Sequence, residues 1–128
     1  MSNEQEIMIS RNDYEKIAAL AQNLETDTGA LLEEELARAK ILDSEKVPHN
    51  VVAMGSVVSF IDEANNQTST VELLYPHEMN KESAYQKISV LAPVGAALIG
   101  LAVGHTIDWP LPNGKTKHLK VISVTNPK

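Results

Sequence analysis

The sequence predicts an α+β protein with two parts, a short antiparallel helical hairpin and a small antiparallel sheet that carries one short helix. Apolar residues in the first 46 positions recur at helical spacing, whereas Val, Ile, Thr and Phe beyond Pro48 cluster in short runs typical of strands. The tract from Ile88 to Pro112 then reads as a strand, a proline-started apolar helix, a glycine-closed turn and a second strand. We therefore expect a coiled-coil hairpin over residues 1–46 and a sheet domain over residues 47–128.

The first helix is predicted to begin after Ser10. Serine is a favoured N-cap residue, and Asp13 three positions later completes a capping-box-like pair. Apolar residues then recur at steps of three, four and three along one face: Tyr14, Ile17, Ala21 and Leu24. The polar segment that follows ends in Gly29, which we expect to close the hairpin turn.

A second helix carries a similar apolar stripe, formed by Leu32, Leu36 and Ala39. Each arm has only about two heptads and reaches roughly 20 Å at 1.5 Å per residue. Because helices this short are marginal alone in water, the base of the hairpin is expected to pack on the following domain. The apolar residues placed for that contact are Ile7, Ile9, Ile41 and Leu42.

Beyond a linker at Val47–Asn50, the pattern becomes mostly that of strands. Strands are predicted at Val57–Ile61 and Thr68–Tyr75, separated by a polar hairpin loop. The polar connection Pro76–Gln86 has room for a short helical turn, and Lys87–Leu91 follows as a strand.

The last third of the chain is expected to hold one helix and a β-hairpin. Pro93 suits the first turn of a helix over Val94–Leu101, which Gly104 is predicted to end. The strands His105–Leu111 and Lys117–Val124 then flank an Asn-Gly pair, a strong hairpin signal.

Composition narrows the class of protein. The chain has no cysteine, so neither disulfides nor cysteine-based zinc sites are possible, and no leader or membrane-length apolar run supports secretion or insertion. We expect a cytoplasmic protein.

Residues 1–46 hold 5 basic and 11 acidic groups and so carry the whole net charge of −6, whereas residues 47–128 hold 6 of each. An acidic arm of this kind repels nucleic acid and favours a basic protein surface, although charge alone is equally consistent with a solvated helix face that has no partner.

Catalytic chemistry is not evident from the sequence. The four histidines are scattered without metal-ligand spacing, and neither a phosphate-binding loop nor a nucleophile elbow is present. One acidic cluster, Glu25, Asp27 and Glu33–Glu35, has magnesium-ligating chemistry, but carboxylates there also complement a helix N-terminus. We predict a protein that is not an enzyme and uses no cofactor or metal.

Three tracts of the sequence resemble one protein family: Pro48–Ser56, Leu74–Pro76 and Val90–Leu101 with the following Val103-Gly104 and Ile107-Asp108-Trp109. They are similar to the C-terminal domain of the transcript-cleavage factors GreA and GreB, and especially to the Rnk group, the regulators of nucleoside diphosphate kinase. The resemblance is strongest from Pro48 to Gly114 and rests on architecture alone before it.

The resemblance implies an FKBP-like C-terminal domain that docks at the rim of the RNA polymerase secondary channel, as a monomer without direct nucleic-acid contact. The docking residues it points to are Leu91, Ala92, Pro93 and Val94, and the residues at the hairpin tip are Glu25, Asp27, Glu33 and Glu34. A hairpin of roughly 20 Å is too short to bring carboxylates to a metal deep in a channel. We therefore predict a polymerase-binding regulator that competes with Gre-type factors without stimulating transcript cleavage.

Two alternatives stay open at the level of sequence. The protein is a regulatory module that binds another enzyme linked to nucleoside diphosphate kinase, or it is a peptidyl-prolyl isomerase, an activity found in proteins of the FKBP fold. The aromatic content argues against the second, because the chain has one Phe, one Trp and three Tyr with which to line a pocket.

Overall fold

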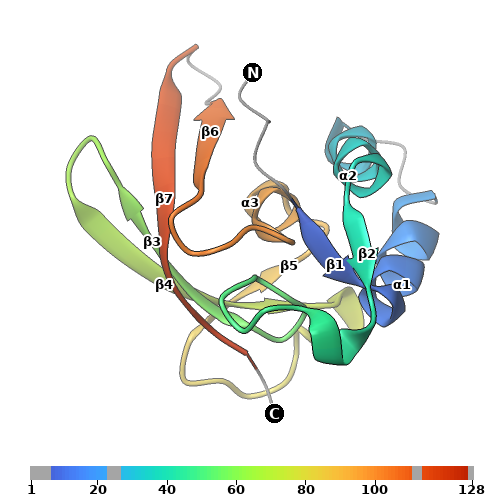
Figure 1. Ribbon diagram of the computed structural model, residues 1–128. Coiled ribbons are helices and arrows are strands. Elements are labelled where there is room, and N and C mark those ends of the chain that lie inside the picture. The colour runs from blue at the N-terminus through green and yellow to red at the C-terminus, as the bar shows by residue number, and fades with distance from the viewer. Residues whose placement is uncertain (1–6, 23–26, 111–113, 127–128) are drawn as a thin grey trace.

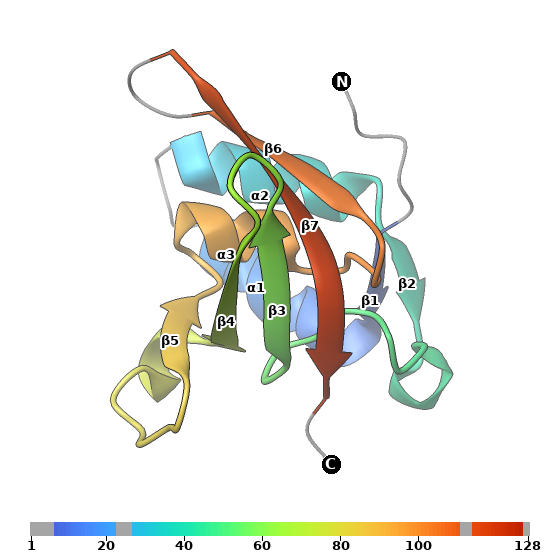
Figure 2. The same cartoon turned by 90° about the vertical axis from the view of Figure 1, so that its left-hand side faces the viewer.

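The computed structural model describes residues 7–22, 27–110 and 114–126. Within them, a five-stranded sheet lies on one side, a short helix covers its inner face, and a helical hairpin packs behind that helix (Figure 1). Seen from the sheet side, the two hairpin helices lie behind the strands (Figure 2). The sheet has the order β5-β4-β3-β7-β6, with bounds β3 Val57–Asp62, β4 Gln67–Leu74, β5 Gln86–Ser89, β6 Thr106–Pro110 and β7 Thr116–Thr125.

The expected antiparallel sheet is correct for four strands and wrong for the fifth. β3 pairs antiparallel with β4 and β7, and β6 pairs antiparallel with β7. β5 instead runs parallel to β4, with Val71 opposite Gln86 and Leu74 opposite Ser89. The connection after Leu74, which includes the predicted short helical turn as the 3-10 helix η2 (Pro76–Glu78), leads the chain back along β4 before β5 begins.

The predicted cap of the first helix is confirmed. Helix α1 (Arg11–Gln22) follows Ser10, whose hydroxyl accepts a hydrogen bond from the backbone N–H of Asp13 at 3.1 Å. Its stripe residues Ile17 and Ala21 are buried, whereas Leu24 lies outside the described residues.

Gly29 does not close the turn between the two helices, contrary to expectation. Helix α2 (Asp27–Ala37) has already begun at Asp27, so Gly29 lies in its first turn and is buried. The predicted stripe residues Leu32 and Leu36 are buried on this helix, and α2 packs against both α1 and the short helix α3 (Pro93–Leu98).

A two-stranded parallel sheet that the sequence pattern did not indicate flanks the helical hairpin. β1 (Met8–Ser10) pairs with β2 (Lys40–Leu42), and a 3-10 helix, η1 (Ser44–Lys46), follows β2. The Met8 N–H also donates to the Gly100 carbonyl at 3.1 Å, which ties β1 to the segment after α3.

The base of the hairpin packs on the following domain, as expected. Ile7 and Ile9 are buried, Ile41 and Leu42 are partly buried, and a Cβ added to Gly100 would lie 2.2 Å from Ile7 Cγ2. Gly100, with φ 84°, is the glycine that turns the chain after α3. The prediction that Gly104 ends this helix is therefore wrong, since Gly104 lies in a later turn that precedes β6.

One apolar core connects the helical hairpin with the sheet. It joins residues of both segments, among them Ile7, Ile17, Leu32, Val58, Leu73, Leu98 and Val121, all of which are almost fully buried. The division at residue 46 stays a prediction, since the apolar core runs continuously across it. Among the described residues, no helix combines the length and apolarity that crossing a bilayer requires.

Candidate docking surface

The loop before α3 is a tight turn held by its own hydrogen bonds. Ser89 Oγ accepts the Leu91 N–H at 3.0 Å, and the Ser89 carbonyl accepts the Ala92 N–H at 3.0 Å. Val90 between them is fully buried and donates its N–H to the Leu74 carbonyl at 2.9 Å. Leu91 and Ala92 are therefore held partly exposed on a turn whose backbone hydrogen bonds are already made.

Close packing of α3 on this turn sets its direction. Gly95 faces the Ser89 carbonyl so closely that an added Cβ would lie 2.1 Å from the oxygen. Pro93 is the first residue of the helix, where its fixed φ is favourable, and Ala96 donates its N–H to the Ala92 carbonyl at 2.9 Å. Close packing at Gly95 is what its place in an apolar, glycine-containing helix predicts, whereas Ser89, which precedes the tract that resembles the Gre family, was not singled out from the sequence.

A cavity of about 320 Å³ adjoins the turn on the inner face of the sheet. Its apolar wall contains Val94, one of the four predicted docking residues, together with Phe60, Val71, Ile88 and Leu119. Its polar rim is formed by Asp62, Asn65, Gln67, Ser69, Gln86 and Lys117. An apolar wall with a polar rim is typical of a surface that receives a side chain of another protein. Among the described residues that line it, Phe60 is the only aromatic one, so the cavity lacks the aromatic walls expected of an isomerase.

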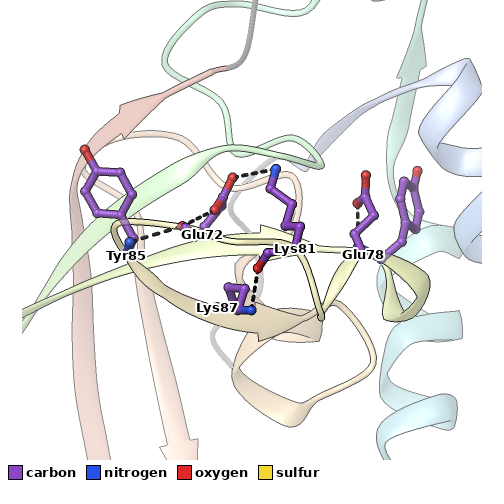
Figure 3. Close-up of polar contacts among 7 residues, drawn as sticks. Glu72, Glu78, Lys81, Tyr85 and Lys87 are labelled. Atoms are coloured by element: carbon purple, nitrogen blue, oxygen red, sulfur yellow. Dashed lines mark hydrogen bonds and ion pairs between the residues drawn. The ribbon is translucent and has the colours of Figure 1, made fainter.

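The polar connection that leads into β5 is anchored to the sheet (Figure 3). Glu72 on β4 accepts the Ser83 hydroxyl and pairs with Lys81 Nζ at 3.2 Å, and Lys87 Nζ donates to the Lys81 carbonyl at 2.6 Å. The hydrogen bond from Ser83, and then the charge and hydrogen bond of Lys81, lower the pKa of Glu72 below its usual range. The connection therefore holds Tyr85, 48% exposed, in a defined place just before the edge strand β5.

The predicted acidic tip separates into residues with different environments. Glu33 and Glu34 are exposed on α2, Asp27 is the first residue of that helix, and Glu25 lies outside the described residues. Glu35 is buried and its carboxylate pairs with Arg38 at 2.8 Å, and burial raises its pKa. Within the described ranges, no group of three His, Asp or Glu side chains is placed to hold a metal ion.

Comparison with known proteins identifies the family. The model of the C-terminal domain of the transcription elongation factors GreA and GreB matches residues 47–126. Over 93 residues the chain is 42% identical to the regulator of nucleoside diphosphate kinase of Escherichia coli strain K12, which covers 73% of this chain and 67% of the relative. It is 35% identical over 83 residues to the transcription elongation factor GreA of Rhodospirillum rubrum, which covers 65% of this chain and 52% of that relative.

Solved structures agree with this assignment. A prokaryotic transcription elongation factor GreA/GreB from Nitrosomonas europaea has a TM-score of 0.76 and 40% identity, over 95% of this chain and 99% of the other. Gfh1 of Thermus aquaticus shares the fold at a TM-score of 0.54 and 22% identity, over 95% and 99% of the two chains. The chain therefore belongs to the GreA/GreB family of transcription elongation factors, within the group of the regulators of nucleoside diphosphate kinase.

Proposed function

We propose that this protein is a transcription regulator that binds RNA polymerase through Leu91–Val94, at the rim of the secondary channel, as a monomer without enzymatic activity of its own. The observation that carries the proposal is the ordered turn at Ser89–Pro93, which holds Leu91 and Ala92 partly exposed beside a cavity with an apolar wall and a polar rim. A turn ordered before binding loses little conformational entropy when a partner docks on it. Relatives of this chain are named as transcription elongation factors GreA, which supports RNA polymerase as the partner. We also propose that the sheet domain is FKBP-like.

The length of the hairpin argues for docking without transcript cleavage. Helices α1 and α2 have 12 and 11 residues, which correspond to about 16–18 Å each at 1.5 Å per residue. A catalytic metal requires carboxylate oxygens within a few tenths of an ångström of ideal bonding distance. We infer that the protein occupies the channel mouth, excludes longer factors and leaves hydrolysis unstimulated.

The test is displacement of labelled GreA from purified core RNA polymerase, with cleavage of backtracked transcripts measured in the same tubes. Displacement without accelerated cleavage supports the proposal. Accelerated cleavage would show the argument from hairpin length to be wrong, and no displacement at micromolar concentrations would remove polymerase as the partner.

A docking variant and a matched control locate the surface. Leu91→Glu places a charge on the proposed docking turn and is expected to weaken displacement about tenfold or more, the cost of a central interface residue. Ile122→Glu makes the same kind of change on β7, at an exposed residue of a different strand, and is expected to leave displacement unchanged. Equal effects of the two variants would place the docking surface elsewhere.

The acidic side chains on α2 are tested separately by charge reversal. The structure limits this test to Glu33 and Glu34, because reversing buried Glu35 would break its pair with Arg38. Glu33→Lys combined with Glu34→Lys is expected to weaken displacement most at low salt, where exposed charges are least screened. Glu63→Lys, at an exposed turn between β3 and β4, serves as the control, and unchanged displacement by the α2 pair would remove the hairpin from the docking surface.

A second candidate partner is nucleoside diphosphate kinase or an enzyme linked to it. The observation that favours it is the 42% identity to a protein named as a regulator of that kinase. Purified kinase assayed with and without the protein distinguishes the two candidates, because a polymerase-binding regulator is expected to leave the phosphotransfer rate unchanged.

A further inference from the structure

A single carboxylate links the base of the helical hairpin to two separate parts of the sheet domain. Asp13 Oδ1 accepts the Tyr75 hydroxyl at 2.9 Å, and Asp13 Oδ2 accepts the backbone N–H of Met54 at 3.3 Å. The two donors lie 62 and 41 residues away along the chain, at the end of β4 and in the segment before β3. Both oxygens of Asp13 are thus used across the junction, and hydrogen bonds to a carboxylate are among the stronger polar contacts in proteins.

The Tyr75 ring is itself held in place from several directions. It is buried, the His77 ring stacks on it with centroids 5.8 Å apart, and Lys16 Nζ of α1 lies 5.6 Å from its centroid. Burial, together with the charge of Asp13, raises the pKa of the Tyr75 phenol, so the hydroxyl stays a donor throughout the physiological pH range. Helix α1 therefore contacts this ring through two side chains one turn apart.

The space beside these contacts is a cleft rather than packed core. A cavity of about 780 Å³ lies between the first turns of α1, residues 44–54 and the end of β7. On this side, Asn12, Asp13 and Lys16 of α1 line the cavity, and Arg11 pairs with Asp43 at 3.8 Å. On the other side, apolar contacts of the shared core hold the hairpin against α3. Apolar attraction is non-directional, so the angle between the two parts is selected by directional hydrogen bonds across the junction, those of Asp13 and the backbone bond from Met8 to Gly100.

We infer that Asp13 and Tyr75 form a latch that fixes the angle between the helical hairpin and the docking turn at Leu91–Val94. Both are positioning residues and contact no partner. The part of the inference that concerns polymerase rests on the proposed function: a fixed angle lets the docking turn and the hairpin engage one partner at the same time. The latch was not apparent from the sequence, where Asp13 reads only as a helix-capping residue.

The angle is measurable without reference to function, because the chain has no cysteine. Spin labels on Ala37→Cys in α2 and Lys120→Cys in β7, both exposed positions, report the distance between hairpin and sheet by pulsed electron paramagnetic resonance. The parent protein is expected to give one narrow distance distribution. Tyr75→Phe removes the hydrogen bond between Tyr75 and Asp13, and Asp13→Asn removes the charge of the acceptor. Each variant is expected to broaden or shift the distance distribution.

Tyr85→Phe is the matched control, since it removes the same hydroxyl from a half-exposed ring outside the latch. It is expected to leave the distribution unchanged. Circular dichroism verifies that each variant is folded, and Tyr75→Phe removes one oxygen atom only, so it keeps the test valid if Asp13→Asn does not fold. The inference is overturned if the folded latch variants give the parent's distribution, or if Tyr85→Phe changes it as much.

The same variants connect the latch to docking. In competition with labelled GreA we expect the latch variants to be about three- to tenfold weaker, about the net effect of one ordinary hydrogen bond. Direct binding without a competitor should weaken by the same factor, because displacement at a shared site follows the affinity of the competing protein. If the parent protein itself displaces nothing, the proposed function fails while the distance measurement still decides the latch. If it competes and the variants compete equally well, the latch has no role in docking.

Discussion

At the residue scale, the docking turn depends on one glycine that is required for space rather than for backbone freedom. Gly95→Ala would place a Cβ 2.1 Å from the Ser89 carbonyl oxygen. In the interior of most helices, replacing glycine by alanine stabilises the folded protein by up to about 1 kcal/mol. Here we expect a loss of about 1–3 kcal/mol in the free energy of unfolding, because the turn and α3 must move apart. Urea denaturation measures it.

The control is Gly104→Ala, whose added Cβ meets nothing within 4 Å. This variant should lose only about 1 kcal/mol in the free energy of unfolding, because alanine is strained at the positive φ of 96°. A Gly95→Ala protein as stable as the parent would show that the turn yields easily and is not held as described.

Another residue-scale contact closes the segment between the two parts of the chain. The Asn126 side chain donates to the carbonyls of His49 at 3.0 Å and Val51 at 3.3 Å and accepts the hydroxyl of fully buried Ser56. Asn126→Ala removes a hydrogen bond from the buried Ser56 hydroxyl, from the carbonyl of buried Val51 and from that of exposed His49, and we expect a loss of about 2 kcal/mol by thermal or urea unfolding. Asn65→Ala removes an amide that caps an exposed turn and should cost about 0.5 kcal/mol. Equal losses would contradict the role of Asn126.

At the scale of elements, the connection before β5 owes its order to Glu72, and this makes a pH dependence testable. The folded-state pKa of Glu72 is lower than its usual value of 4.5, so the unfolded chain binds the proton more readily. The resulting stabilisation is present above pH 4.5 and is lost as the pH falls through the lowered pKa. Glu72→Gln should therefore lower the melting temperature at pH 7, and its difference from the parent should shrink in acid.

Glu82→Gln is the matched control for this measurement. Glu82 is exposed in the same connection, so its variant should follow the parent from pH 7 to pH 3. A Glu72→Gln protein that melts a constant interval below the parent at all pH values would show that the carboxylate charge is not what anchors the connection.

At the scale of the whole molecule, the hairpin and the sheet share one core, which predicts that residues 47–128 are much less stable alone. Ile7 and Ile9 pack at Gly100, and losing the burial of these two side chains costs about 3–6 kcal/mol. That is a large part of the 5–15 kcal/mol that stabilises a typical domain. The denaturation midpoint of residues 47–128 should lie well below that of the full chain. Equal midpoints would instead establish two independent units divided at residue 46.

Much of the fold could be predicted where local patterns decide it. The cap at Ser10, the strands β3, β4, β6 and β7 and the proline-started helix at Pro93 each follow from neighbouring residues. The predictions from Gly29 and Gly104 were wrong because a glycine permits a chain reversal without requiring one. Of the candidate site, the sequence indicated the docking turn by resemblance, but not the cavity that adjoins it, which Phe60 and Leu119 form from separate strands.

The sequence by itself determined the order of the helices and of the strands β3 to β7, the excess of acidic residues in the hairpin and the family, because periodicity, charge and motif are carried by residues close together in the chain. The tertiary structure alone decided the rest. It placed β5 parallel to β4, paired β1 with β2, buried Glu35 while leaving Glu33 and Glu34 exposed, and brought Asp13 to Tyr75. These contacts join residues far apart in sequence, and their free energies exist only once the shared core has closed around them.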